Sequence, residues 1–184
     1  MADALVVIDI QNEYFPGGAL TLPDAEGAAG RAAAAIAAAR RLGVPVVHIR
    51  HEEPGSDEYF VPGSNGAEIH AAVAPAGGEP VIVKNHPNSF LETDLAERLA
   101  GMGARRVAFC GMMTSMCVDA TVRAAADLGL DPVLVDDACA APDLEHRGRR
   151  VPAEEVHAAF CAALADEIAT LRATDDFTAG PADA

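Results

Sequence analysis

Short apolar runs that alternate with helical segments constrain the fold of this chain more than any other feature. Residues 4–8 form a continuous apolar run that ends at Asp9, which is typical of a strand buried on both faces of a parallel sheet. The same alternation of strand and helix patterns continues along the chain. The runs that predict strands are 4–8, 44–49, 80–83, 106–110, 132–135 and 170–174. The segments that predict helices are 24–42, 67–73, 91–102, 118–129 and 153–169.

Alternating strands and helices predict an α/β fold with a doubly wound, mainly parallel six-stranded sheet and helices on both faces. A length of 184 residues suits one domain with a sizeable core, and no repeat or linker divides the chain. We therefore expect a single domain over residues 1–177 and a disordered tail over residues 178–184. The core is expected to be aliphatic, because 51% of the residues are apolar and only 4% are aromatic.

The charge and the cysteine content exclude several classes of function. A formal net charge of −15 argues against nucleic acid or an anionic membrane as partner, and it would favour a cationic small-molecule substrate. No apolar run approaches the ~18 residues of a membrane-spanning helix, and the N-terminus lacks the basic segment of a signal peptide. The four cysteines show no C-x-x-C spacing, so we expect free thiols in a reducing compartment, the cytoplasm.

Three residues with nucleophilic or acid–base chemistry are predicted at one edge of the sheet. Asp9 follows the first strand, Lys84 follows the third, and Cys117 follows the fourth, at the start of a helix. Functional sites in such sheets form at the carboxyl ends of the strands, so these side chains are expected to meet. Lys84 is the only lysine in the chain, and every other Lys-or-Arg position is Arg. This bias indicates that the position requires a compact ammonium rather than a planar guanidinium. Each residue alone has an ordinary structural explanation, and only their shared position indicates a site.

Together these residues would form a nucleophilic site. The ammonium and the helix start would lower the pKa of the Cys117 thiol, because both favour the thiolate. Asp9 would take the thiol proton and later give it to a leaving amine, while Lys84 would hold Asp9 in place. Backbone N–H groups of Met113 and Cys117 would stabilise the developing oxyanion. The predicted reaction is acyl transfer from an amide through a thioester.

Side chains on the loops at this edge are candidates for substrate binding. Ligand pockets are mostly apolar with few polar groups, and three aromatic residues, Tyr14, Phe15 and Phe60, lie on these loops. We therefore predict substrate contacts from these three residues and from Gln11 and Met112 in the neighbouring motifs. Core packing stays open as an alternative for Phe15.

The same residues lie in motifs that resemble a known family. D-I-Q-N at 9–12, Lys84 followed by S-F at 89–90, and G-M-M-T-S-M-C-V at 111–118 resemble the isochorismatase-like cysteine hydrolases. That group includes nicotinamidases, carbamoylsarcosine-type amidohydrolases and streptothricin hydrolase, and the resemblance covers about residues 5–177. It implies a triad of Asp9, Lys84 and Cys117, a cis peptide before Met113 that aims two N–H groups at the oxyanion, and a homodimer or homotetramer.

The metal-binding pattern of the nicotinamidase branch is only partly present. By resemblance, that branch carries an Asp and three His in and after the second strand, whereas residues 48–53 here read H-I-R-H-E-E. We therefore predict no metal and no cofactor, and a cysteine amidohydrolase acting on a small amide, lactam or carbamoyl compound. Two alternatives stay open. One is a non-catalytic thiol sensor or binding subunit with a low-pKa Cys117, and the other is a zinc-assisted amidase using His48, His51, Asp57 or His70.

Overall fold

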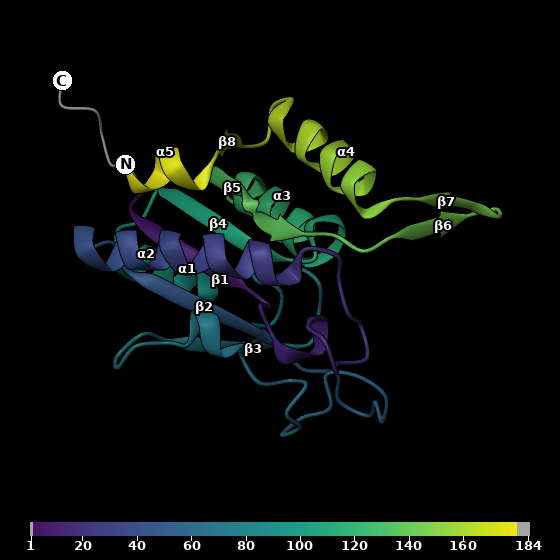
Figure 1. The fold of residues 1–184 in the computed structure, drawn as a ribbon. Helices are drawn as coiled ribbons and strands as arrows, with labels where there is room; N and C mark the ends of the chain where they lie inside the picture. Colours follow the sequence, from purple (N-terminus) through teal and green to yellow (C-terminus); the bar gives the residue numbers. More distant parts are fainter. Residues whose placement is uncertain (1, 180–184) are drawn as a thin grey trace.

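The six predicted strands form one parallel sheet in the computed structural model, which describes residues 2–179 (Figure 1). The sheet order is β3-β2-β1-β4-β5-β8, and every neighbouring pair is parallel. All residues of β1 are buried, because helices cover both faces of the sheet at its centre. The strands are β1 (Ala4–Ile8), β2 (Val46–His51), β3 (Val81–Lys84), β4 (Arg106–Met112), β5 (Asp131–Ala140) and β8 (Thr170–Arg172).

The direction of the crossovers places the helices on the two faces. The chain moves one way along the sheet from β1 to β2, and the other way from β4 to β5. Right-handed crossovers then put the two connecting helices, α1 and α3, on opposite faces, as Figure 1 shows. The predicted doubly wound α/β fold is therefore confirmed. The helices are α1 (Ala25–Leu42), α2 (Leu95–Gly101), α3 (Asp119–Asp127), α4 (Ala153–Ala165) and α5 (Thr174–Thr178).

The core is aliphatic, and α1 shows how small side chains bring the layers close. Its buried face is alanine apart from one isoleucine, so the helix backbone approaches the sheet closely. The helix ends at Gly43, which has a positive φ of 70° and whose N–H bonds back to the last turn. Within residues 2–179, no helix combines the length and the apolar character that crossing a membrane requires. The buried residues of α1 are Ala25, Ala28, Ala29, Ala32, Ala35, Ile36, Ala38 and Ala39.

Several predicted element boundaries were wrong. The segment 67–73 forms only a short 3-10 turn, Ala71–Val73, because His70 caps it and redirects the chain. The helix predicted over 91–102 begins only at Leu95, where the Thr93 hydroxyl accepts the Leu95 N–H at 3.3 Å. The predicted helix over 153–169 ends at Ala165, and β5 extends beyond the predicted 132–135 to Ala140.

A hairpin replaces part of the loop expected over residues 138–150. Strands β6 (Leu144–His146) and β7 (Arg149–Val151) pair antiparallel and extend away from the body of the molecule (Figure 1). The pairing of His146 with Arg149 leaves a two-residue turn, and Arg147 and Gly148 both have positive φ, 51° and 77°. These values are typical of a type I′ hairpin turn. At the C-terminus, α5 includes Thr178, and the remainder of the tail predicted to be disordered lies outside the described residues, apart from Ala179.

The crossover direction reverses at the centre of the sheet, between β1 and β4. Strands β1 and β4 are neighbours, but their following helices pack on opposite faces. The carboxyl ends of these two strands are therefore a topological switch point, where α/β sheets bind ligands. Asp9 follows β1 at this point, and Cys117 follows β4.

Candidate active site

The structure brings Asp9, Lys84 and Cys117 together at the carboxyl edge of the sheet. The Lys84 Nζ atom lies 2.6 Å from Asp9 Oδ2 and 3.3 Å from Cys117 Sγ. All three residues are buried, with 0%, 1% and 5% of their surfaces exposed for Asp9, Lys84 and Cys117. A buried ammonium thus contacts both a carboxylate and a thiol, in a setting where charge interactions are screened weakly.

Asp9 occupies an unusual backbone conformation that directs its carboxylate into the site. Its φ is 49°, in the left-handed region that Asp tolerates better than most residues. Oδ2 lies 2.6 Å from Lys84 Nζ, and neither carboxylate oxygen has a hydrogen-bond partner of good geometry among residues 2–179. Buried polar atoms in folded proteins nearly always have partners. The Asp9 carboxylate is therefore an acceptor held available inside the site.

The turn that leads to Cys117 depends on Gly111. This glycine has φ of 139°, and a Cβ atom there would overlap the Ile8 carbonyl oxygen of the neighbouring β1. Only glycine allows β4 to approach β1 this closely before the chain turns. The Met112–Met113 peptide that follows is cis, as the family resemblance implies. A π-type helical turn, Thr114–Val118, then carries Cys117 and continues directly into α3.

The expected lowering of the Cys117 pKa was wrong. Burial raises the pKa of this thiol to about 12, and the negative charge of Asp9 raises it further, so the opposing effect of Lys84 is outweighed. The thiol is then almost entirely protonated at pH 7. Cys117 therefore rests as a neutral thiol, which argues against a sensor that relies on a standing thiolate.

His51 is a member of the site that sequence reasoning treated only as a metal-ligand candidate. It is the last residue of β2, directly opposite Lys84 in the strand register, and its Nδ1 atom lies 3.2 Å from Lys84 Nζ. Burial acts to lower the pKa of Lys84, but the interactions with Asp9 and Cys117 together outweigh it and raise this pKa. The predicted strand 44–49 stopped two residues short of His51, so the position at a strand end, which identified Lys84, did not identify His51.

The three predicted aromatic residues, Tyr14, Phe15 and Phe60, are nearly fully buried. Tyr14 packs edge-on against Phe60, with ring centroids 5.2 Å apart. Burial raises the pKa of Tyr14 well above its usual value, and the interactions with Cys117 and Asp9 add to this. Phe15 instead stacks on His70 at 3.7 Å, farther along the loop. Substrate contact by these rings stays a prediction.

The side chains of Gln11 and Met112 are engaged elsewhere. Both N–H bonds of the Gln11 amide are used, because Nε2 donates to the carbonyl oxygens of His51 and Ala67 at 2.8 and 2.7 Å. The amide oxygen accepts the His51 N–H at 2.8 Å. Met112 is completely buried in the core. In this structure Gln11 therefore organises the backbone around His51, and Met112 fills the core beneath the site.

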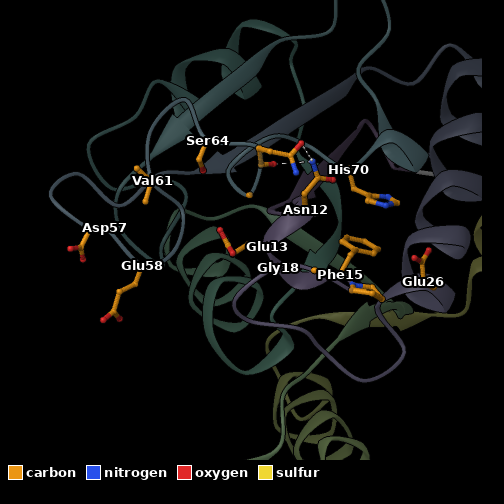
Figure 2. A pocket seen from close by; sticks show the side chains of 14 residues that line it. Asn12, Glu13, Phe15, Gly18, Glu26, Asp57, Glu58, Val61, Ser64 and His70 are labelled. Atoms are coloured by element: carbon orange, nitrogen blue, oxygen red, sulfur yellow. Dashed lines mark hydrogen bonds between the residues drawn. The ribbon is translucent and has the colours of Figure 1, made fainter.

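Glu13 is a buried carboxylate that the sequence did not single out. Its two oxygens accept the backbone N–H groups of Ala19 and Phe60, at 2.7 and 3.1 Å. It therefore ties the loop after β1 to the loop after β2. Beside it lies a cavity of about 740 Å³ with four carboxylates and no Lys or Arg in its lining (Figure 2). The carboxylates belong to Glu13, Glu26, Asp57 and Glu58, and Phe15 and His70 form part of the wall.

The four zinc-ligand candidates do not converge on one point. His48 bonds through Nε2 to Glu79, His70 stacks on Phe15, and Asp57 lies on an exposed loop. Among the described residues, no group of three or more His, Cys, Asp or Glu side chains is arranged to hold a metal ion. The residues present therefore do not fit the zinc site of the nicotinamidase branch.

Comparisons with known proteins point to one family. The family model of the isochorismatase domain matches residues 3–176. The isochorismatase family protein YddQ of Bacillus subtilis is 46% identical over 178 residues, which are 96% of this chain and 99% of YddQ. A crystal structure described as an isochorismatase hydrolase of Oleispira antarctica is 44% identical, with a TM-score of 0.94 and 97% of each chain covered.

Two further relatives carry the names of specific enzymes. Streptothricin hydrolase of Streptomyces noursei is 36% identical over 172 residues, covering 90% of this chain and 60% of that protein. Maleamate amidohydrolase of Pseudomonas putida is 33% identical over 147 residues, covering 72% of this chain and 69% of that enzyme. Hydrolases, an amidohydrolase among them, are thus present among the relatives.

Proposed function

The chain belongs to the isochorismatase family of hydrolases, and we propose that it is a cysteine-dependent amidohydrolase. Its substrate is a small amide, lactam or carbamoyl compound, whose C–N bond is cleaved through a thioester on Cys117. The observation that carries this proposal is the buried contact of one ammonium with a carboxylate and a thiol, at 2.6 and 3.3 Å from Lys84 Nζ. An amidohydrolase among the relatives supports the choice of a C–N bond.

The first half of the reaction forms the thioester. The Cys117 sulfur attacks the carbonyl carbon, and its proton passes to Asp9, whose two buried carboxylate oxygens lack hydrogen-bond partners of good geometry among residues 2–179. The carbonyl electron pair moves to oxygen, which the N–H groups of Met113 and Cys117 stabilise; one such donor is typically worth about 3 kcal/mol. The C–N bond then breaks, Asp9 returns the proton to the nitrogen, and the amine leaves.

The second half regenerates the enzyme. Water attacks the thioester carbonyl while Asp9 takes one of its protons, and the bond to sulfur breaks to release the acid. The proton on Asp9 returns to the Cys117 thiolate. Lys84 holds the carboxylate in position throughout and stabilises negative charge on oxygen or sulfur. The pKa of about 12 at Cys117 requires the proton to move as the attack occurs, since hardly any thiolate exists beforehand.

We further propose that the substrate carries a positive charge. The formal net charge is −15, and the cavity beside Glu13 is lined by four carboxylates (Figure 2). A negative surface raises the encounter rate with cations, and dissolved salt weakens this effect. The value of kcat/KM for cationic amides should therefore fall as ionic strength rises, while the value for neutral amides stays constant. Equal responses of the two amide classes would contradict this part of the proposal.

The experiment that tests the proposal is an amide library assayed against three proteins. Wild type should release amine from at least one amide, lactam or carbamoyl compound, in buffer containing a chelator. Cys117→Ala should abolish that turnover, and Asp9→Asn should lower kcat by at least about a hundredfold, since general acid–base catalysis typically contributes 10²–10⁴. Undiminished turnover by Cys117→Ala would overturn the mechanism. Activity that requires zinc would favour the metal-assisted alternative.

By resemblance to its family, we also propose that the chain assembles as a homodimer or homotetramer. Light scattering coupled to size exclusion would measure the mass of the assembly directly. A monomer of 18.9 kDa at micromolar concentration would contradict this proposal.

A further inference from the structure

The Lys84 ammonium has a third neighbour that the proposed reaction does not use. A protonated lysine carries three N–H donors and no acceptor. Two of its contacts are Asp9 Oδ2 at 2.6 Å and Cys117 Sγ at 3.3 Å, and the third is His51 Nδ1 at 3.2 Å. An ammonium can only donate, so the Nδ1 atom of His51 must present its lone pair. The Lys84 ammonium thus contacts three groups that can accept: Asp9 after β1, His51 at the end of β2 and Cys117 after β4.

The far side of the His51 ring sets which nitrogen carries the proton. His51 Nε2 lies 3.3 Å from Glu53 Oε2, and this carboxylate can only accept. Glu53 therefore favours the tautomer with hydrogen on Nε2, which leaves Nδ1 free to accept from Lys84. Glu53 is 44% exposed, so the chain of contacts runs from solvent through His51 to the buried ammonium.

The position of the His51 ring is fixed by its backbone and by Phe60. The Gln11 amide bonds to both the N–H and the carbonyl oxygen of His51, at 2.8 Å each. The ring packs edge-on against Phe60, with centroids 5.3 Å apart and an interplanar angle of 84°. These contacts leave the imidazole little freedom to turn. The His51 side chain can therefore hold the Lys84 ammonium in a fixed orientation.

We propose that His51 is a positioning residue for the proposed amidohydrolase reaction, because its Nδ1 fixes the orientation of the Lys84 ammonium toward Asp9 and Cys117. The proposal rests on the proposed function and goes beyond it by assigning a fourth residue. Burial lowers the pKa of His51, and the charge of Lys84 lowers it further, while Asp9 and Glu53 oppose this. The ring is therefore neutral at pH 7, as its role requires. These are the charged groups that face His51 from β3, β1 and the loop after β2.

The expected effect lies in kcat, because His51 acts through Lys84. A misplacement of about 1 Å in a catalytic group can lower a rate about a hundredfold. We expect the loss of the Nδ1 acceptor to lower kcat by about 10- to 100-fold and to leave KM within about threefold. The same loss should slow alkylation of Cys117, because a misdirected ammonium stabilises the thiolate less.

Two substitutions separate positioning from packing. His51→Phe keeps a ring against Phe60 and removes the acceptor, so it should show the full loss of kcat. His51→Asn places an amide oxygen near the position of Nδ1, so it should recover most of the activity. All assays contain a chelator, so that loss of a metal ligand does not mimic the effect. Wild-type kcat in His51→Phe, no recovery in His51→Asn, or a change confined to KM would overturn the proposal.

The alkylation rate of Cys117 keeps this test independent of the substrate. Iodoacetamide labelling is followed by intact mass at pH 8.5, with Cys117→Ala as the background for the other thiols. Labelling should slow severalfold in His51→Phe and recover in His51→Asn, and equal rates in all three proteins would overturn the proposal. If wild type hydrolyses no amide, the proposed function fails, and labelling alone decides the role of His51.

A surface variant covers the case in which the His51 variants do not fold. Glu53→Ala removes only a half-exposed side chain and frees the tautomer of His51. It should lower kcat, or the labelling rate where no substrate is found, by about threefold. Unchanged values would then overturn the proposal.

Discussion

Replacing Lys84 with Met should destabilise the protein far more than breaking an ion pair of the same length at the surface. Asp9 and Lys84 lie 2.6 Å apart with both side chains 0% exposed. Met keeps the length of the side chain but leaves the Asp9 carboxylate buried without its cation. Breaking a buried pair in this way typically lowers the free energy of unfolding by about 3–5 kcal/mol. For a chain of this size that corresponds to a fall in Tm of about 6–20 °C.

The Arg98–Asp94 pair provides a matched control for that prediction. Its atoms are 2.7 Å apart, but the two side chains are 44% and 51% exposed. Arg98→Met should therefore leave the free energy of unfolding nearly unchanged. Urea denaturation at pH 7 measures both variants, and adding Asp9→Asn to Lys84→Met should recover at least about half of the loss. If Lys84→Met lowers the free energy of unfolding by less than about 1 kcal/mol, the conclusion that Asp9 and Lys84 form an ion pair shielded from water would be refuted.

Three further outcomes test other parts of the structure. Gly111→Ala should destabilise by about 3 kcal/mol or prevent folding, because its Cβ would overlap a backbone oxygen of β1, whereas Gly77→Ala in open space should be nearly neutral by the same denaturation assay. An arginine hydrogen bond holds the pKa of Glu79 at about 2, so stability present above pH 4.5 should be lost as pH falls toward 2, and Glu79→Gln should flatten that part of a stability-versus-pH curve. Asp9→Asn should speed iodoacetamide labelling of Cys117 at pH 8, because it removes a negative charge that raises the thiol pKa. A stability curve unchanged by Glu79→Gln, or slower labelling, would contradict these last two.

The sheet and the placement of Asp9, Lys84 and Cys117 follow from local sequence patterns. The run 4–8 is apolar at every position, and the structure buries all of β1 because helices cover both faces. Parallel strands share one carboxyl edge, so residues that end strands lie at the same edge whatever the strand order. This reasoning placed Asp9, Lys84 and Cys117 on one edge, and their side chains are in contact.

The length of β5 was hidden by its polar residues. Asp136 and Asp137 follow the predicted strand 132–135, but they lie within β5 where the register against β4 shifts. The shift leaves residues 135–138 opposite Cys110 alone, so the acidic pair falls in a bulge. Asp137 then accepts the N–H and hydroxyl of Thr174 at 2.8 and 2.7 Å. That partner is distant in sequence, so no local pattern reveals it.

The protonation state of Cys117 also depends on distant residues. Its position after a strand predicted a lowered pKa from the helix start and the ammonium. The structure adds burial and the carboxylate of Asp9, and these outweigh Lys84. The contact between His51 and Lys84 also depends on residues distant in sequence. It requires the register of β2 against β3 and the hydrogen bond from the His51 N–H to the Gln11 amide oxygen. The pKa of Cys117 and the contact of His51 with Lys84 depend on distances in space, which residue spacing along the sequence does not reveal.

The central claim is that Cys117 carries the acyl group, and rapid-quench intact mass measures this directly. Wild-type protein is mixed with an amide that it hydrolyses, and the reaction is quenched in acid within milliseconds to seconds. The account predicts a mass increase equal to the acyl portion, located on the Cys117 peptide, which appears and decays at rates consistent with turnover. An acyl group on another residue, or full turnover by Cys117→Ala, would contradict it.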